Sequence, residues 1–283
     1  MLHPFKLVDV FGTDPFTGNP VAVIGNAENF TSEEMQRITR WLNLSESTFL
    51  LPPTSPDADY RVRIFTLARE LPFAGHPTLG TCHAWLEASG QPKKEGIVIQ
   101  ECGAGLITIR NDGHELSFAA PPLIRTGNPS EAEIARAAQV LRIDREQIVD
   151  EQWVDNGPGW LAVMLSSAEA VLAVEPLRHF PDRVDIGLVG AHSADSDAAF
   201  ELRAIFSGQN GELIEDPVTG SLNASVGQWL FSSGRAKVSY VACQGTRLGR
   251  SGTVRLAQDP CGQVWVGGRT ETLFASEQFH DRS

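Results

Sequence analysis

Long hydrophobic runs and basic clusters are both missing from this chain of 283 residues. Nowhere do about 18 apolar residues follow one another, so we expect no membrane-spanning helix and no membrane partner. The N-terminus lacks the basic and then apolar segments of an export signal. Lys and Arg number 23 against 35 Asp and Glu, a formal net charge of -12. So acidic a surface repels phosphate backbones, and we therefore expect no nucleic-acid partner.

Cysteine is scarce as well. The four cysteines, Cys82, Cys102, Cys243 and Cys261, lie far apart and form no C-x-x-C pair. This spacing argues against a disulfide-stapled secreted scaffold and against a zinc site, and reduced thiols in a cytoplasmic protein are the simpler interpretation. With 42% hydrophobic and 20% charged residues, the chain can bury a real core. Its length suits one large domain or two ordinary ones.

The first half alternates strand patterns with turns and one clear helix. Thr31 and Glu34 form a capping-box pattern, and apolar residues then recur at helical spacing, which predicts an amphipathic helix over 32–42. Its apolar stripe, expected to face a sheet, consists of Met35, Ile38, Trp41 and Leu42. The β-rich segments 5–11 and 21–24 predict a hairpin, and a second helical pattern covers 72–86. Further strands are predicted at 48–51, 60–65, 97–100, 106–109 and 116–119.

The second half repeats this order from Pro121 onward. Ser130 and Glu133 form another capping box before a helical stripe, and 160–165 reads as a strand. The segment 217–221 (PVTGS) echoes 72–76 (PFAGH), about half the chain earlier, and each opens an apolar helix. We therefore expect two similar domains, 1–120 and 121–283. The last segment of the second domain is free to cross back to the first. The capping box and the glycine-containing motif lie farther apart in the second half than in the first, which predicts an insertion around 166–200.

The two apolar helices have starts that suit anion binding. A helix that is apolar on every side is buried, yet its first-turn N–H groups stay unpaired and carry the positive end of the helix dipole. Gly75 and the Gly220–Ser221 pair are small enough for an anion to reach this backbone. If the two halves face each other, both helix starts open on one cleft that fits a small carboxylate. The alternative is that both glycines only permit tight turns.

Acid–base residues flank both turns. His76 follows Gly75, and Asp216 precedes Pro217. Each has an ordinary structural interpretation, since Asp is common in turns and a lone His is more often structural than catalytic. Glu46 lies between a predicted helix end and a β-rich run, and its position alone does not distinguish it from other acids.

At these residues the sequence resembles the PhzF family, the phenazine-biosynthesis-like isomerases related to diaminopimelate epimerase. The similar stretches occur in order over most of the chain. They are 8–11 (VDVF), 15–23 (PFTGNPVAV), 44–49 (LSESTF), 70–81 (ELPFAGHPTLGT), 156–158 (NGP), 215–221 (EDPVTGS), 244–245 (QG) and 248–250 (LGR). The combination of FAGHPT with EDPVTGS is specific to the family.

The resemblance implies an α/β (α+β) fold of two similar domains, each with a curved or barrel-like sheet around a central helix. It further implies a homodimer, a site in the cleft between the domains, and chemistry without metal or cofactor. By this resemblance Glu46 is the proton-transferring acid/base and His76 and Asp216 assist it. The matching residues Ser45, Gly75, Gly220 and Ser221 hold the substrate. A carboxylate is a weak base toward carbon unless apolar surroundings raise its pKa and water is excluded.

Two departures from the family pattern concern the substrate. Many members carry a His-containing run after the second motif, where this chain has 222–225 (LNAS). Before the first motif, where many members have Thr-Pro, this chain has 66–70 (TLARE), and Arg69 there suits either an acidic substrate group or a solvated loop. We therefore expect a small carboxylate substrate without assigning the phenazine precursor.

Several rival functions make different demands on the sequence. A two-cysteine racemase needs a thiol at both helix starts, where this chain has His76 and Ser221. A serine hydrolase would carry G-x-S-x-G, which does not occur. For a metal hydrolase, His76 and His83 lack a third ligand motif. A catalytically silent dimeric scaffold of the same fold is the non-enzyme alternative, and the intact Glu46, His76 and Asp216 argue against it.

Overall fold

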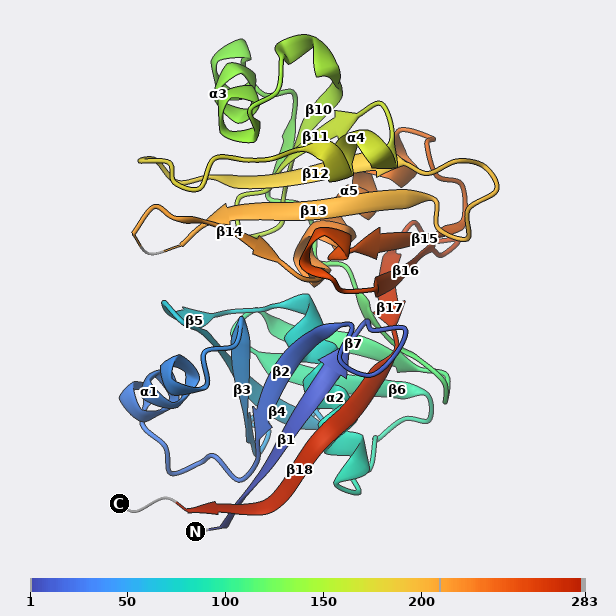
Figure 1. Cartoon of the computed structure of the whole chain (residues 1–283). Helices are drawn as coiled ribbons and strands as arrows, with labels where there is room; N and C mark the ends of the chain where they lie inside the picture. Colours follow the sequence, from blue (N-terminus) through green and yellow to red (C-terminus); the bar gives the residue numbers. More distant parts are fainter. Residues whose placement is uncertain (1, 209, 281–283) are drawn as a thin grey trace. The chain divides into compact units, whose positions relative to one another are not determined.

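The computed structural model describes residues 2–208 and 210–280 and divides the chain into two compact units. Unit 1 takes the residues up to 119 and those from 267 onward, and unit 2 takes residues 120–266 (Figure 1). The last strand, β18 (Thr270–His280), pairs antiparallel with β1 (Leu2–Val10), so this segment lies in unit 1. The sequence predicted domains 1–120 and 121–283, with a last segment free to return to the first domain. The division described here assigns the residues from 267 onward to unit 1.

Unit 1 is a sheet with two helices. Figure 1 shows β2, β1 and β18 lying side by side, and the remaining strands continue the sheet from β2. Besides β1 and β18, the strands of unit 1 are β2 (Asn19–Ile24), β3 (Glu46–Leu51), β4 (Tyr60–Thr66), β5 (Glu70–Leu71), β6 (Ile97–Cys102), β7 (Gly105–Asn111) and β8 (Leu116–Ala119). The helices are α1 (Ser32–Leu42) and α2 (Gly75–Glu87). The predicted hairpin of 5–11 with 21–24 is confirmed as the antiparallel pair β1 and β2.

Unit 2 has a similar set of elements and one more α-helix. Its strands are β9 (Arg125–Gly127), β10 (Ile148–Asp155), β11 (Leu161–Leu165), β12 (Asp185–Ala191), β13 (Phe200–Ser207), β14 (Leu213–Asp216), β15 (Ser239–Gln244), β16 (Gly252–Gln258) and β17 (Val264–Gly268), which runs across the boundary. Its helices are α3 (Glu131–Leu141), α4 (Ala168–Ala173) and α5 (Gly220–Ser232), with short 3-10 turns η1 (Arg145–Gln147) and η2 (Thr246–Leu248).

The pairing of β1 to β7 is repeated by β10 to β16. In both units the first two strands are antiparallel, the second and third are parallel, and the third and fourth are antiparallel. The fourth strand then pairs antiparallel with the fifth and parallel with the sixth, which is antiparallel to the seventh. The chain is therefore a duplicated supersecondary unit, as the internal echo predicted.

The duplication aligns the helices differently from the sequence prediction. α1 connects the second and third strands of unit 1, and the helix at the same place in unit 2 is α4, whereas α3 precedes β10. The two capping boxes led to α1 being matched with α3, and that match is wrong. The region 166–200 holds α4 and β12, the counterparts of α1 and β3, so the expected insertion there is also wrong.

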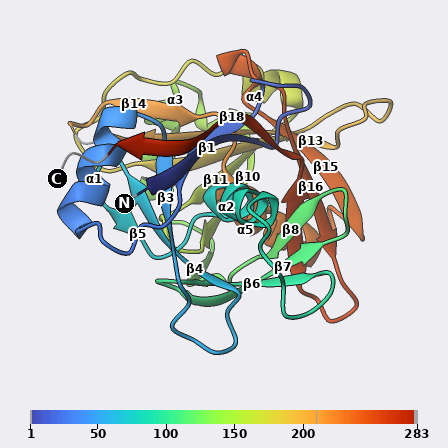
Figure 2. The same ribbon diagram turned by 90° about the horizontal axis from the view of Figure 1, so that it is seen from below.

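The central helices α2 and α5 are buried by the sheets of their own units. α2 contacts β1, β2, β3, β6, β8 and β18, and in Figure 2, where it is seen nearly along its axis, strands of unit 1 lie on several sides of it. α5 contacts β10 and β16 and places Leu222 against Gly187 of β12. This arrangement explains why both helices carry apolar or small residues on every side. In the described residues no helix has the length and hydrophobicity needed to cross a membrane.

The outer helix α1 has one polar and one apolar face, but the predicted apolar stripe is partly wrong. Met35 is buried, and Ile38 and Leu42 pack on the same cluster against Phe49 and Phe65. Trp41 instead is 83% exposed. At 3.6 residues per turn it lies at the edge of the stripe, where a small rotation of the helix turns it to solvent.

Substitution of Gly80 tests how closely α2 packs in its sheet. A Cβ there would lie 2.3 Å from Val21 Cγ1 and 3.1 Å from Val10 Cγ2. Helix propensity alone would make Gly80→Ala stabilising by about 1 kcal/mol, whereas overpacking costs about 1–3 kcal/mol. We expect urea unfolding to show net destabilisation, while Gln139→Ala on the exposed side of α3 changes the free energy of unfolding by less than about 0.5 kcal/mol. A stabilised Gly80→Ala protein would contradict the close packing.

Candidate active site

Glu46 is the first residue of β3 and belongs to the interior of the unit 1 sheet. Its strand pairs with β2 on one side and β4 on the other, with Glu46 opposite Val21 and Thr66. The side chain is only 16% exposed. The sequence position did not distinguish Glu46 from other acids, but pairing on both sides fixes its backbone and half-buries its side chain. Ser45 directly precedes the strand and is half-buried as well.

His76, the second residue of α2, contacts Glu46. Its Nδ1 lies 3.6 Å from Glu46 Oε2 and 3.5 Å from the side-chain nitrogen of Asn19, and the ring also hydrogen-bonds the Pro20 carbonyl. The side chain is almost completely buried. Among the described residues, Nε2 has no hydrogen-bond partner. A buried ring nitrogen without a partner is costly unless a ligand meets it, so Nε2 is available to a bound molecule.

Burial controls the charge of His76. Removal from water lowers the pKa of the imidazole to about 3, and the hydrogen bond to Pro20 opposes this only in part. The ring is therefore neutral at neutral pH, and its contact with Glu46 joins a carboxylate to a neutral imidazole rather than two opposite charges. A neutral imidazole can donate or accept a hydrogen bond without adding charge to the site.

The start of α2 leaves its first N–H groups open. Ala74, the N-cap residue, provides no side-chain cap, and the first helical hydrogen bond runs from Thr78 N to the Ala74 carbonyl. Pro77 has no N–H, so Gly75 and His76 supply the backbone donors that have no partner among the described residues. In contrast, α1 and α3 are both closed by complete capping boxes. The uncapped start carries the positive end of the dipole beside Glu46 and suits a substrate anion.

In unit 2, Asp216 ends β14 and is joined to the start of α5 by a polar network. The Thr219 hydroxyl donates to Asp216 Oδ2 over 2.6 Å. Gln244 on β15 donates to the Asp216 carbonyl and to Thr219 Oγ1, and its Oε1 accepts from Thr219 N and from Asn223. Thr219, the N-cap residue of α5, forms no side-chain cap. The network fixes this turn and leaves the first turn of α5 uncapped, as in α2.

Ser221, the second residue of α5, corresponds in position to His76. Trp160 donates its indole N–H to Ser221 Oγ over 3.0 Å, and Asn156 donates to the Ser221 carbonyl over 2.9 Å. Because Trp160 occupies an acceptor position, the hydroxyl proton of Ser221 is available to a ligand. Gly220, the first residue of the helix, has no side chain to cover the backbone donors.

The structure thus places Glu46, Ser45, Gly75 and His76 around one helix start and Asp216, Gly220 and Ser221 around the other. That both starts open on one cleft concerns the arrangement of the units and stays a prediction. Sequence reasoning did not select four polar residues that hold these groups: Asn19, Asn156, Trp160 and Gln244. Asn19, Asn156 and Gln244 lie inside the family stretches, which was a usable signal, whereas Trp160 lies outside them.

The positions of the thiols argue against cysteine catalysis at these helix starts. Cys82 lies within α2 and is buried, and burial raises the pKa of its thiol to about 12. Burial also raises the pKa of Cys102, at the end of β6. A thiol that stays protonated at neutral pH is a poor base and nucleophile.

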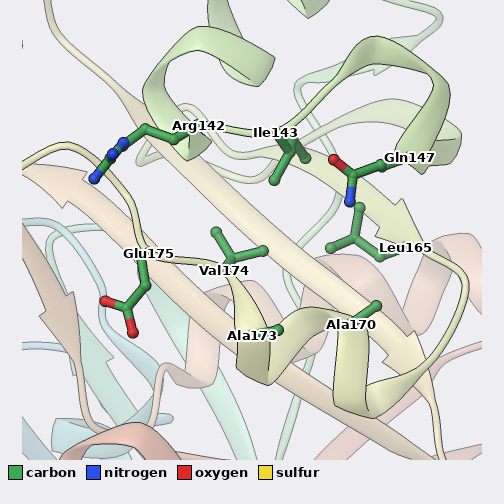
Figure 3. A pocket seen from close by; sticks show the side chains of 8 residues that line it. All are labelled: Arg142, Ile143, Gln147, Leu165, Ala170, Ala173, Val174 and Glu175. Atoms are coloured by element: carbon green, nitrogen blue, oxygen red, sulfur yellow. The ribbon is translucent and has the colours of Figure 1, made fainter.

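A separate pocket of about 450 Å³ lies in unit 2 and contains none of the predicted site residues. Figure 3 shows it between the α3–η1 segment and α4, with Arg142 and Glu175 as its charged side chains. Its other lining residues are Ile143, Gln147, Leu165, Ala170, Ala173 and Val174. This lining offers a mostly apolar hollow without an acid–base pair in contact.

The neutral state of His76 predicts a pH dependence of stability. Its pKa is about 3 in the folded protein and 6.5 when unperturbed, so the unfolded chain binds more protons between these values. The contribution to stability is complete above the unfolded pKa and is lost as the pH falls. At about 1.36 kcal/mol per pH unit, lowering the pH from about 7 to about 5 should cost about 2 kcal/mol more in the wild type than in His76→Gln.

Urea unfolding of both proteins at the two pH values measures this difference, because the other titrating groups cancel between them. Equal pH dependence in the two proteins would show that His76 is not held neutral by burial.

Comparison with known proteins identifies the family of the chain. It matches the phenazine biosynthesis-like protein family, PhzC-PhzF, over residues 8–274. Antisense-enhancing sequence 1 of Schizosaccharomyces pombe is 35% identical, covering 98% of this chain and 99% of that protein. A trans-2,3-dihydro-3-hydroxyanthranilate isomerase of Pseudomonas aeruginosa is 34% identical, covering 78% of this chain and 77% of the relative.

Solved structures agree in fold. A "Predicted Epimerase" of Pseudomonas aeruginosa superposes with a TM-score of 0.82 at 26% identity, covering 99% of this chain and 100% of the other. A "probable proline racemase" from Agrobacterium radiobacter, at 16% identity and a TM-score of 0.61, shares the fold alone, covering 99% of this chain and 93% of that one. The expected α/β fold of the diaminopimelate epimerase and proline racemase kind is confirmed. The chain belongs to the phenazine biosynthesis-like PhzC-PhzF family of isomerases.

Proposed function

We propose that this isomerase moves a proton between carbons of a small carboxylate substrate, with Glu46 as the acid/base. The observation that carries the proposal is the contact of Glu46 with buried, neutral His76 at the uncapped start of α2. A base, a neutral hydrogen-bonding group and free backbone donors are thereby gathered in unit 1. These are the parts that proton abstraction next to an electron-withdrawing group requires.

The reaction follows from these parts. Glu46 takes a proton from a substrate carbon, and the electron pair of the broken C–H bond moves into the adjoining unsaturated or carboxylate system. The negative charge that develops there is stabilised by the Gly75 and His76 N–H groups and by the imidazole. Glu46 then returns the proton to a different carbon, so that no atoms are gained or lost. We propose that no cofactor takes part, because every proton and electron remains in the substrate or on Glu46.

Substrate binding is proposed for Ser45 and Gly75 in unit 1 and for Gly220 and Ser221 in unit 2. The free backbone donors of both helix starts suit a carboxylate, and Ser221 can donate its hydroxyl proton because Trp160 holds its oxygen. Asp216, an acceptor already fixed by Thr219, suits a substrate amine or hydroxyl group. The homodimer and the cytoplasmic location implied by the sequence stay predictions.

Deuterium exchange tests the role of Glu46. The protein is incubated in deuterated water with small carboxylates, beginning with trans-2,3-dihydro-3-hydroxyanthranilate, which appears in the name of the Pseudomonas relatives, and mass spectrometry follows carbon-bound deuterium. We expect exchange by the wild type to fall by at least about 10³-fold in Glu46→Gln, because the amide cannot accept the proton. Glu131→Gln, on the exposed start of α3, is the matched control and should retain wild-type exchange.

The same assay separates the rivals. Exchange that survives Glu46→Gln but is lost on alkylation of cysteines would establish a thiol racemase instead. Absence of exchange with any carboxylate that binds measurably would favour a silent scaffold.

Trp160→Phe tests the proposed role of Ser221. The substitution removes the donor that orients the Ser221 hydroxyl and keeps an aromatic ring. We expect KM to rise about tenfold, the effect of one lost hydrogen bond of about 1.4 kcal/mol, with kcat changed by less than about twofold. Trp265→Phe, which loses its indole bond to Asp259, is the control and should keep the wild-type KM. An unchanged KM in Trp160→Phe would remove Ser221 from the proposed binding site.

A further inference from the structure

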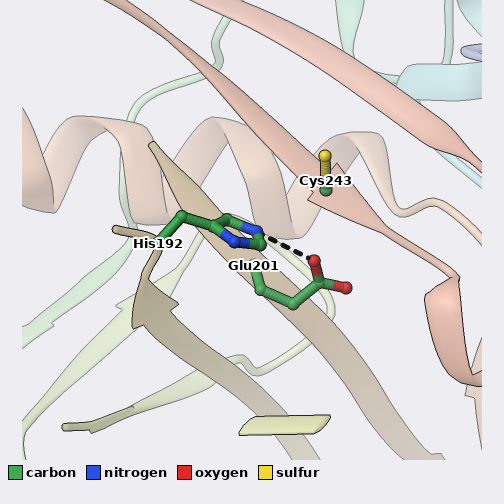
Figure 4. A group of neighbouring side chains, drawn as sticks. All are labelled: His192, Glu201 and Cys243. Atoms are coloured by element: carbon green, nitrogen blue, oxygen red, sulfur yellow. Dashed lines mark hydrogen bonds and ion pairs between the residues drawn. The ribbon is translucent and has the colours of Figure 1, made fainter. Parts of the chain in front are cut away.

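Three chemically different metal ligands lie together in unit 2, apart from every residue assigned above. His192 directly follows β12, Glu201 lies in β13, and Cys243 lies in β15. Glu201 and Cys243 are register partners across the parallel pair β13 and β15, so their side chains leave the sheet on the same face. The backbone bond from His192 N to the Ala199 carbonyl folds the imidazole toward them. Figure 4 shows the three side chains, whose ligand atoms all lie within 4.8 Å of one another.

Glu201 is a buried carboxylate without a permanent positive partner. Its side chain is 2% exposed, and its contacts are the Thr246 hydroxyl at 2.7 Å and His192 Nε2 at 3.1 Å. No Arg or Lys of the described residues forms an ion pair with it. Glu215, another acid of the same unit with little exposure, is held instead by both guanidinium nitrogens of Arg203. A buried charge is costly unless paired, and His192 pairs with Glu201 only when the ring is protonated.

We propose that His192, Glu201 and Cys243 bind one Zn²⁺ ion. Imidazole nitrogen, carboxylate oxygen and thiolate sulfur are the ligands zinc takes in proteins, at about 2.0–2.3 Å and with tetrahedral geometry. Such bonds place ligand atoms about 3.3–3.6 Å apart. The separation of His192 Nε2 and Glu201 Oε2, 3.1 Å, is close to this already, and the Cys243 sulfur lies within 4.8 Å of both ligand atoms. Water takes the fourth position, as in sites with three protein ligands.

The charges of this site balance. Zn²⁺ displaces the Cys243 proton to solvent, against a pKa that burial and the nearby Glu201 raise. Glu201 binds as a carboxylate, and His192 binds through the Nε2 lone pair with its proton on Nδ1. Two negative ligands then neutralise the doubly charged ion. The hydroxyl of Thr246 keeps its bond to the other oxygen of Glu201 and orients the carboxylate.

The ion would join β13 and β15 to the residue that follows β12. Gln244, next to Cys243 on β15, points to the opposite face of the sheet, where it holds Asp216 and Thr219. Zinc on one face would therefore fix the strand that positions the polar network on the other. This role is structural and leaves the proton chemistry to Glu46, so the two proposals fail separately.

Metal binding by the purified full chain tests the site. The protein is freed of metal with a chelator and titrated with Zn²⁺ against a competing indicator, and bound zinc is counted by mass spectrometry. We expect one Zn²⁺ per chain, and affinity at least about 100-fold weaker in Cys243→Ser and in His192→Ala. Co²⁺ in place of Zn²⁺ should give a thiolate-to-metal absorption band that is absent from Cys243→Ser.

Matched controls use residues of the same type elsewhere in unit 2. Cys261→Ser, at an exposed cysteine, and His179→Ala, at an exposed histidine, should keep both the stoichiometry and the cobalt band. Circular dichroism of each variant establishes that it is folded. Binding of less than one ion by the wild type, or binding equally tight in folded Cys243→Ser, would overturn the site and leave His192 and Glu201 as a buried hydrogen-bonded pair.

Discussion

Each unit is organised by a helix that its own sheet buries. Such a helix can satisfy its backbone along its length, but at its start the N–H groups need partners that the apolar core does not supply. The outer helices α1 and α3 meet this need with Thr31 and Ser130 and their reciprocal glutamates. α2 and α5 have no such caps. The difference between capped and uncapped starts is what gives this fold two helix starts that suit an anion.

The two starts differ in the residue that follows the first glycine. In unit 1 it is His76, which burial keeps neutral and whose ring contacts Glu46. In unit 2 it is Ser221, whose oxygen is held by Trp160. The same backbone arrangement thus carries acid–base groups in unit 1 and hydrogen-bonding groups in unit 2. Asp216, at the end of β14, accepts from the hydroxyl of Thr219, the N-cap residue of α5. Duplication supplied the scaffold, and the two helix starts differ in the side chains that they present.

Much of this was predictable because it depends on short-range patterns. The helix of 32–42 follows from the capping box and the spacing of Met35 and Ile38, and its observed bounds agree. The orientation of Trp41 was not predictable, because rotation of a helix by a fraction of a turn depends on the sheet beneath it. The correspondence of α1 with α4 was hidden too, since equivalence in a duplicated fold rests on strand pairing, whereas a capping box recurs in unrelated helices. Only the family resemblance distinguished Glu46 from the other acids. Its partial burial results from the pairing of β3 with β2 and β4, which the local sequence does not reveal.

Because β18 returns to unit 1, the sheet of unit 1 can be completed only after unit 2 has been synthesised. β18 is the partner of β1, yet it comes last in the sequence, after all of unit 2. During synthesis the residues of unit 2 leave the ribosome while β1 still lacks a neighbour on one edge. An unpaired sheet edge is open to pairing with other chains. The candidate site at Glu46 therefore lies in the part of the protein whose sheet is completed only after all of unit 2 has been synthesised.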